Sequence, residues 1–145
     1  MRYISAQDLT EVLSERTLIE LSNDSSRAAT ANEAVLDKAC QYAVETVDGY
    51  LRARYVLPLT SVPTLVRNIC LHLARYWLYS RRPDGKGFPD NVKETHAQAL
   101  KDLERIQAGK LHLGLPERGV QGDDTQPSVP RFVARASDKT DLTGY

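Results

Sequence analysis

The segment Asp48–Pro63, DGYLRARYVLPLTSVP, constrains the fold of this chain more than any other stretch. Apolar residues recur at the helical period both before this segment and after it, and Pro58 and Pro63 lie between the two periodic stretches. A proline removes a backbone donor and pushes the preceding residue out of the helical region, whereas its missing N–H costs nothing in the first turn of a helix. The segment therefore predicts a sharp corner between two long helices.

Apolar residues recur at the helical period in four parts of the sequence, which predicts an all-α domain. Ser5 and Asp8 form a helix-starting capping pair, and Asp90 is a suitable N-cap for the last helix. Gly109 lies where a left-handed helix end is expected. The predicted helices cover residues 6–15, 32–55, 63–80 and 91–108, with one further turn after the first around Leu18, Ile19 and Leu21.

The predicted helix over residues 63–80 is apolar on two sides, because Leu71, Ala74 and Leu78 form a second, narrower stripe. Such a helix either lies at the centre of its domain or offers one face to a partner. For a chain this small we expect the partner, so this stripe is a predicted subunit interface. Tyr55 and Tyr79 are added to it because amphipathic rings suit interfaces, although a place in the core explains both tyrosines equally well.

Composition limits the classes of function. The 145 residues suffice for one domain. The 19 basic and 19 acidic residues give a net charge of zero, so the chain as a whole does not attract nucleic acid electrostatically. The N-terminal sequence MRYISAQDLTEVL lacks the apolar stretch of a signal peptide, and no apolar run approaches the roughly 18 residues of a membrane span. We therefore expect a soluble intracellular protein without a membrane partner, and reduced, packed thiols at Cys40 and Cys70.

The composition changes at Pro116. Only eight of the last thirty residues are apolar, and a segment of this kind cannot bury enough surface to offset its ordering entropy. We divide the chain into a helical domain, residues 1–115, and an extended, mostly irregular C-terminal docking arm, residues 116–145. The arm's predicted partner contacts are Arg131, Phe132, Val133, Leu142 and Tyr145.

No complete catalytic, metal-binding or nucleotide-binding pattern is present. His72, His96 and His112 lack the spacing of metal ligands and the partners of a catalytic base, so we expect neither an enzyme nor a cofactor. A basic cluster lies at the end of the third predicted helix. It could grip DNA phosphates, but solvated cations near a helix C-terminus are the interpretation we favour. The cluster consists of Arg75, Arg81, Arg82 and Lys86.

The order of several motifs resembles a known family. The motifs are YISAQDL, VDGYLRARYVLPL, VPTLVRNICLHLARYWLY, an ALKDL helix and GKLHLGL. Over residues 1–115 they resemble the head-to-tail connector proteins of Mu-like phages and prophages. GYLxxRYxLPL followed by VP and LARYxLY is the most specific part, whereas residues 22–32, residues 82–90 and the arm contribute little.

The resemblance implies a structural virion protein with no catalytic residues to transfer. It implies a ring, expected to be dodecameric, that lies below the portal protein, closes the DNA-filled head and gives a downstream neck or tail-completion protein a platform. An extended C-terminal segment would clasp the portal, and DNA would only pass through the ring. The protein would lie in the virion neck after assembly in the host cytoplasm. The alternative function is a small helical DNA-binding or packaging factor that uses the basic cluster.

Overall fold

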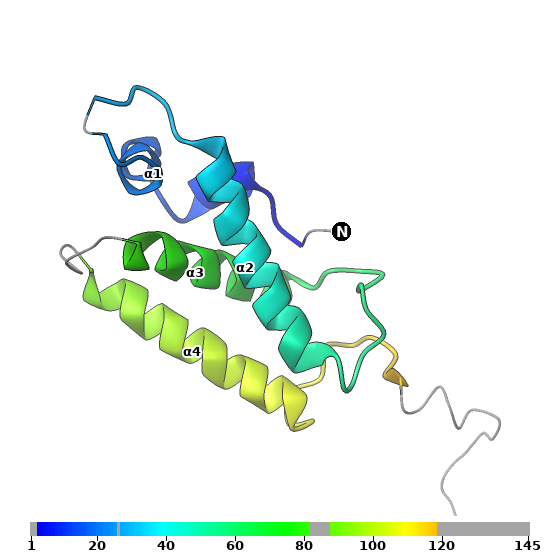
Figure 1. Ribbon diagram of the computed structural model, residues 1–145. Helices are drawn as coiled ribbons and strands as arrows, with labels where there is room; N and C mark the ends of the chain where they lie inside the picture. The colour runs from blue at the N-terminus through cyan, green and yellow to red at the C-terminus, as the bar shows by residue number, and fades with distance from the viewer. Residues whose placement is uncertain (1–2, 26, 82–87, 119–145) are drawn as a thin grey trace, which may run out of the picture.

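The computed structural model describes residues 3–25, 27–81 and 88–118. In chain order these residues form the 3-10 helix η1 (Ala6–Glu11) and the α-helices α1 (Glu15–Ser22), α2 (Glu33–Leu51), α3 (Thr64–Ser80) and α4 (Asp90–Gln107). Figure 1 shows α2 crossing α3, α4 running along α3, and α1 lying near the N-terminal end of α2. Every named element in the described residues is a helix, which confirms the all-α class.

The N-terminal region differs from the prediction. The expected single helix over residues 6–15 is instead η1 followed by a separate helix α1. The carboxylate of Asp8 accepts a hydrogen bond from the Ser5 N–H (2.8 Å), which confirms the predicted capping pair at the start of η1. Ser14 then accepts a bond from the Thr17 N–H (3.2 Å) and caps α1. The predicted first helix is therefore shorter than expected, and the further turn predicted around Leu18 is part of the separate helix α1, which Ser14 caps.

Helix α2 begins as predicted, since the Asn32 side chain accepts a hydrogen bond from the Ala34 N–H (3.1 Å). It ends at Leu51, four residues earlier than predicted. The Tyr55 N–H still bonds to the Leu51 carbonyl, but Tyr55 is already paired with Glu117 in an isolated antiparallel bridge. A contact more than sixty residues away in the sequence thus ends the helix.

Helix α3 is the centre of the domain, because it packs against α2, α4, η1 and α1. Helix α4 starts with Pro89 at the N-cap position and Asp90 as its first residue, without the side-chain cap predicted for Asp90. Its C-terminal end is as predicted, since Gly109 has a φ of +83°. The buried hydrophobic residues of α3 are Val66, Ile69, Cys70, Leu71, Leu73, Ala74 and Leu78.

Both cysteines are buried free thiols, as expected. Burial raises the pKa of the Cys70 thiol to about 12, and the charges of Asp48 and Cys40 raise it further in the same direction. Close by, the Tyr3 hydroxyl donates a hydrogen bond to Asp48 Oδ1 (2.6 Å). Burial and this bond raise the pKa of Tyr3 well above its usual value. The interior between α2, α3 and the N-terminal segment therefore favours the neutral forms of both groups.

Candidate assembly surfaces

The stripe predicted as a subunit interface lies in the core. Leu71 is 2% exposed, and Ala74 and Leu78 are fully buried. The reason is the central position of α3, because η1 and α1 pack against it in addition to α2 and α4. The prediction that α3 offers a free apolar face to a partner is therefore wrong.

Tyr55 is also a core residue, at 1% exposure, so its predicted interface role is wrong as well. Its hydroxyl accepts a hydrogen bond from the Leu113 N–H (3.1 Å), and its ring meets the His112 ring edge-on at 6.0 Å. Tyr79 is half-buried, with its ring 5.9 Å from that of Phe88. Its interface role stays a prediction.

Arg54 joins the corner after α2 to the segment after α4. Its Nε donates to the Gln107 carbonyl (2.9 Å), and its Nη1 donates to Glu117 Oε1 (2.9 Å). The guanidinium lies over Gly109, where a Cβ would come within 2.5 Å of Arg54 Nη2. Gly109 is thus required both by its positive φ and by the close approach of Arg54. We call Arg54, Gly109 and Glu117 the Arg54 clamp.

Further contacts hold the described end of the chain against the corner. The Arg118 N–H donates to the Arg54 carbonyl (2.7 Å), and the Arg118 side chain donates to the Arg52 carbonyl (2.9 Å). His112 Nε2 lies 3.0 Å from Glu117 Oε2. The contacts of the helical domain therefore continue to Arg118, which is held beside the corner.

Replacing Arg54 with methionine should release residues 111–118 while leaving the four α-helices folded. The change removes both side-chain hydrogen bonds and leaves Glu117 without its arginine, which costs about 1–3 kcal/mol. Hydrogen exchange measured by mass spectrometry should show faster exchange of the amides in residues 111–118 only. Arg52→Met is the matched control, because the Arg52 side chain makes no hydrogen bond or ion pair in the described residues. Equal protection in both variants would contradict the clamp.

Two arginines of the basic cluster hold the fold together. Arg75 is buried; it donates to Thr95 Oγ1 (2.8 Å) and more weakly to the Val12 carbonyl (3.5 Å), so it links α3 to α4 and to the end of η1. Its predicted DNA-facing role is therefore wrong. Arg81 donates to the Leu21 carbonyl (2.5 Å) at the C-terminal end of α1 and forms an ion pair with Asp24 (3.4 Å). Arg82 and Lys86 lie outside the described residues.

The corner carries exposed apolar surface. Among the described residues, the large hydrophobic side chains that are exposed are Tyr42, at 37%, and Val56, at 53%. Val56 borders a small pocket of about 240 Å³ that Leu115 and Pro116 also line. We call Val56, Leu115 and Pro116 the corner patch. It joins the end of α2 to the segment from which the C-terminal residues depart.

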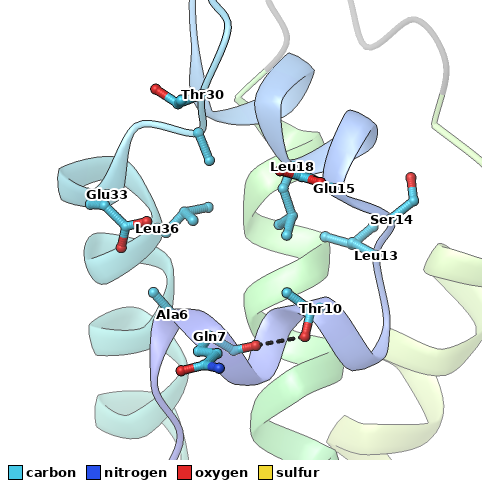
Figure 2. A pocket seen from close by; sticks show the side chains of 11 residues that line it. Ala6, Gln7, Thr10, Leu13, Ser14, Glu15, Leu18, Thr30, Glu33 and Leu36 are labelled. Carbon is cyan, nitrogen blue, oxygen red and sulfur yellow. Dashed lines mark hydrogen bonds between the residues drawn. The ribbon is translucent and has the colours of Figure 1, made fainter.

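A larger pocket, of about 670 Å³, lies between η1, α1 and the start of α2. In Figure 2, Leu36 from α2 and Leu18 from α1 lie on opposite sides of it, with η1 below them. Glu15 and Glu33 lie at its rim, and no cation lines it. We call this pocket the N-terminal groove. Its lining residues are Ala6, Gln7, Thr10, Leu13, Ser14, Glu15, Leu18, Thr30, Ala31, Glu33 and Leu36.

The described residues contain no cluster of histidine, cysteine and acidic side chains that could hold a metal ion. The ring of His96 stacks on that of Tyr76 at 3.6 Å, and burial lowers the pKa of both His72 and His96. Within the same part of the chain, no helix is long and apolar enough to cross a membrane. The predicted arm contacts Arg131, Phe132, Val133, Leu142 and Tyr145 lie outside the described residues.

The sequence of this chain is similar to those of known phage and prophage proteins. The family model described as Bacteriophage Mu, Gp36 matches residues 3–131. The chain belongs to the Bacteriophage Mu Gp36 family. It is 30% identical over 118 residues to "Gene product J" of Escherichia phage Mu, which covers 81% of this chain and 80% of that protein. It is 33% identical over 90 residues to the "Mu-like prophage FluMu protein gp36" of Haemophilus influenzae, which covers 62% of this chain and 60% of that protein.

Membership of the Gp36 family confirms the Mu-like phage resemblance and makes the chain a phage protein. The match extends through the corner, the Arg54 clamp and the segment that follows α4. Sequence reasoning missed Arg54 and Glu117, because each is a charged residue in a turn region and nothing local indicates that they meet. The sequence signal that could have indicated this contact is Gly109, which was predicted to end the helix, because a glycine also allows another part of the chain to approach the backbone closely.

Proposed function

We propose that this Gp36-family protein is the head-to-tail connector subunit of its phage. Its subunits would form a ring below the portal protein, close the DNA-filled head and present a platform to a downstream neck or tail-completion protein. The ring is expected to be dodecameric and to lie in the virion neck, with DNA only passing through it. The observation that carries the proposal is the Arg54 clamp, which fixes where a 27-residue C-terminal segment leaves a compact helical domain.

A fixed departure point matters for a segment that docks on another protein. Residues 119–145 are polar and poor in large apolar side chains, a composition typical of segments that bind another protein. When its first residue is held in place, such a segment searches a smaller volume for its binding surface, which raises its effective concentration there. The predicted contacts with the portal protein are Arg131, Phe132, Val133, Leu142 and Tyr145.

The alternative, a DNA-binding or packaging factor, has less support. Arg75 is buried, and Arg81 bonds to Leu21 and Asp24. Phosphate binding would have to compete with these intramolecular contacts. The net charge of zero also provides no general attraction for DNA.

Deleting residues 119–145 should leave the helical domain folded but prevent heads from joining tails. The cut follows Arg118 because Glu117 and Arg118 belong to the contacts of the domain. Circular dichroism of the purified variant should keep its helical signal and a cooperative thermal transition. In a phage that carries the variant, electron microscopy should show separate heads and tails. Infectious particles in normal number would contradict a docking role for the segment.

A further inference from the structure

The corner patch and the N-terminal groove lie beyond opposite ends of one rigid element. The groove is lined by Glu33 and Leu36 at the start of α2, and Val56 follows its end. The 19 residues of α2 span about 28 Å at 1.5 Å per residue. The corner patch therefore cannot reach the groove of its own chain, but it can reach that of a second copy.

The two surfaces are complementary in shape and polarity. The corner patch presents Val56, an aliphatic side chain that is 53% exposed. The N-terminal groove is a concave site with the leucines Leu18 and Leu36 on its two sides (Figure 2). An exposed aliphatic side chain that enters such a pocket loses contact with water, which stabilises the contact.

The two surfaces are also complementary in charge. Glu15 and Glu33 are exposed at the rim of the groove, and neither has an ion-pair partner within the described residues. Arg52, at the C-terminal end of α2, and Lys110, which follows Gly109 of the Arg54 clamp, are exposed cations. Glu117 is the one acidic residue in residues 52–63 and 108–118, and it is already paired with Arg54. A contact between the surfaces would bring two carboxylates toward two cations that have no ion-pair partner among the described residues.

We propose that the corner patch of one copy docks in the N-terminal groove of the next. The contact is heterologous, because two different surfaces of the same chain meet, and a repeated heterologous contact closes into a ring when its rotation allows. The inference rests on the proposed connector function and adds the two surfaces that would join its subunits. It replaces the earlier prediction that Leu71, Ala74 and Leu78 form the subunit interface, because these three residues are buried in the core.

A charge exchange in the full-length protein tests this contact. Glu15→Lys with Glu33→Lys, and separately Arg52→Glu with Lys110→Glu, should each lower the titre of the phage by about a hundredfold or more, because apposed like charges cost several kcal/mol. Combining all four changes should restore the titre to within about tenfold of wild type. Glu94→Lys with Glu104→Lys, two exposed residues of α4, is the matched control and should leave the titre unchanged.

Restoration is the decisive result. Lysines at positions 15 and 33 also disfavour the N-terminal ends of α1 and α2 through the helix dipole, but changes at the distant corner cannot repair that cost. A photo-crosslinking benzoylphenylalanine in place of Val56 gives a second measurement in assembled particles. It should link to residues 6–18 or 30–36 of another copy, which mass spectrometry can identify.

The outcomes separate the two proposals. If the phage joins heads to tails without this protein, the connector function fails, and the contact between copies fails with it. If the protein is required but the combined variant is not restored, or if position 56 links to another part of the second copy, only the corner-to-groove contact is overturned.

Discussion

Leu71→Asp should unfold the helical domain. Leu71 is 2% exposed on the central helix α3, so the substitution places a carboxylate in an apolar interior without a designed partner. The buried charge and the lost packing together cost more than about 4 kcal/mol, a large share of the stability of a domain of this size. Circular dichroism at 25 °C should show a strong loss of helical signal, and the cooperative thermal transition should disappear.

Val56→Asp is the matched control. It is also an aliphatic-to-aspartate change, but Val56 is 53% exposed and lies outside the helices. The variant should keep the helical signal and lose less than about 1 kcal/mol of stability. If Leu71→Asp kept a folded helical domain and lost only assembly, Leu71 would be a surface residue and the packing around α3 would be wrong.

Raising the pH should destabilise the protein through Cys70. Burial raises the pKa of this thiol to about 12, so the folded state holds the proton that the unfolded chain releases near pH 9. The resulting stability is fully present below pH 9 and is lost as the pH rises toward 12. At 1.36 kcal/mol per pKa unit, this loss amounts to about 4 kcal/mol. Tyr3, whose pKa is also raised, adds a loss in the same direction above its unfolded value near 10.

The measurement is the free energy of unfolding in urea between pH 8 and pH 11. Cys70→Ala removes the ionising group, so its stability should fall less steeply with pH than that of wild type, whatever the fixed cost of the smaller side chain. Tyr3→Phe should flatten the upper part of the curve in the same way, and its loss of the bond to Asp48 is a separate cost at neutral pH. Parallel curves for wild type and Cys70→Ala would show that the thiol is not buried as described.

Local patterns predicted much of the fold. The limits of α3 and α4 agree with the structure to within one residue, because strong periodicity and a proline or a glycine mark their ends. The end of α2 was placed four residues late because Tyr55 follows the helical pattern while its partner, Glu117, lies far along the chain. The division between η1 and α1 depends on Ser14, which caps α1. The sequence alone did not show that Ser14 would start a new helix.

The site was harder to predict. The stripe on α3 has the same sequence pattern whether a partner or other parts of the same chain cover it, and only the packing of η1 and α1 distinguishes the two. The corner patch and the N-terminal groove each combine residues from separate segments, so no single stretch of sequence contains either surface. The Mu-like phage family was recognisable because its motifs surround the corner.

Gly109 and Arg54 have a consequence for how this protein can change over generations. A side chain at position 109 would meet the guanidinium of Arg54 and would also strain the backbone. Arg54 in turn satisfies the carboxylate of Glu117. A side chain at position 109 would therefore displace the Arg54 guanidinium, and its displacement would take from Glu117 the partner of its ion pair. Three positions spread over more than sixty residues of sequence are thus coupled through the side chain of one of them, Arg54.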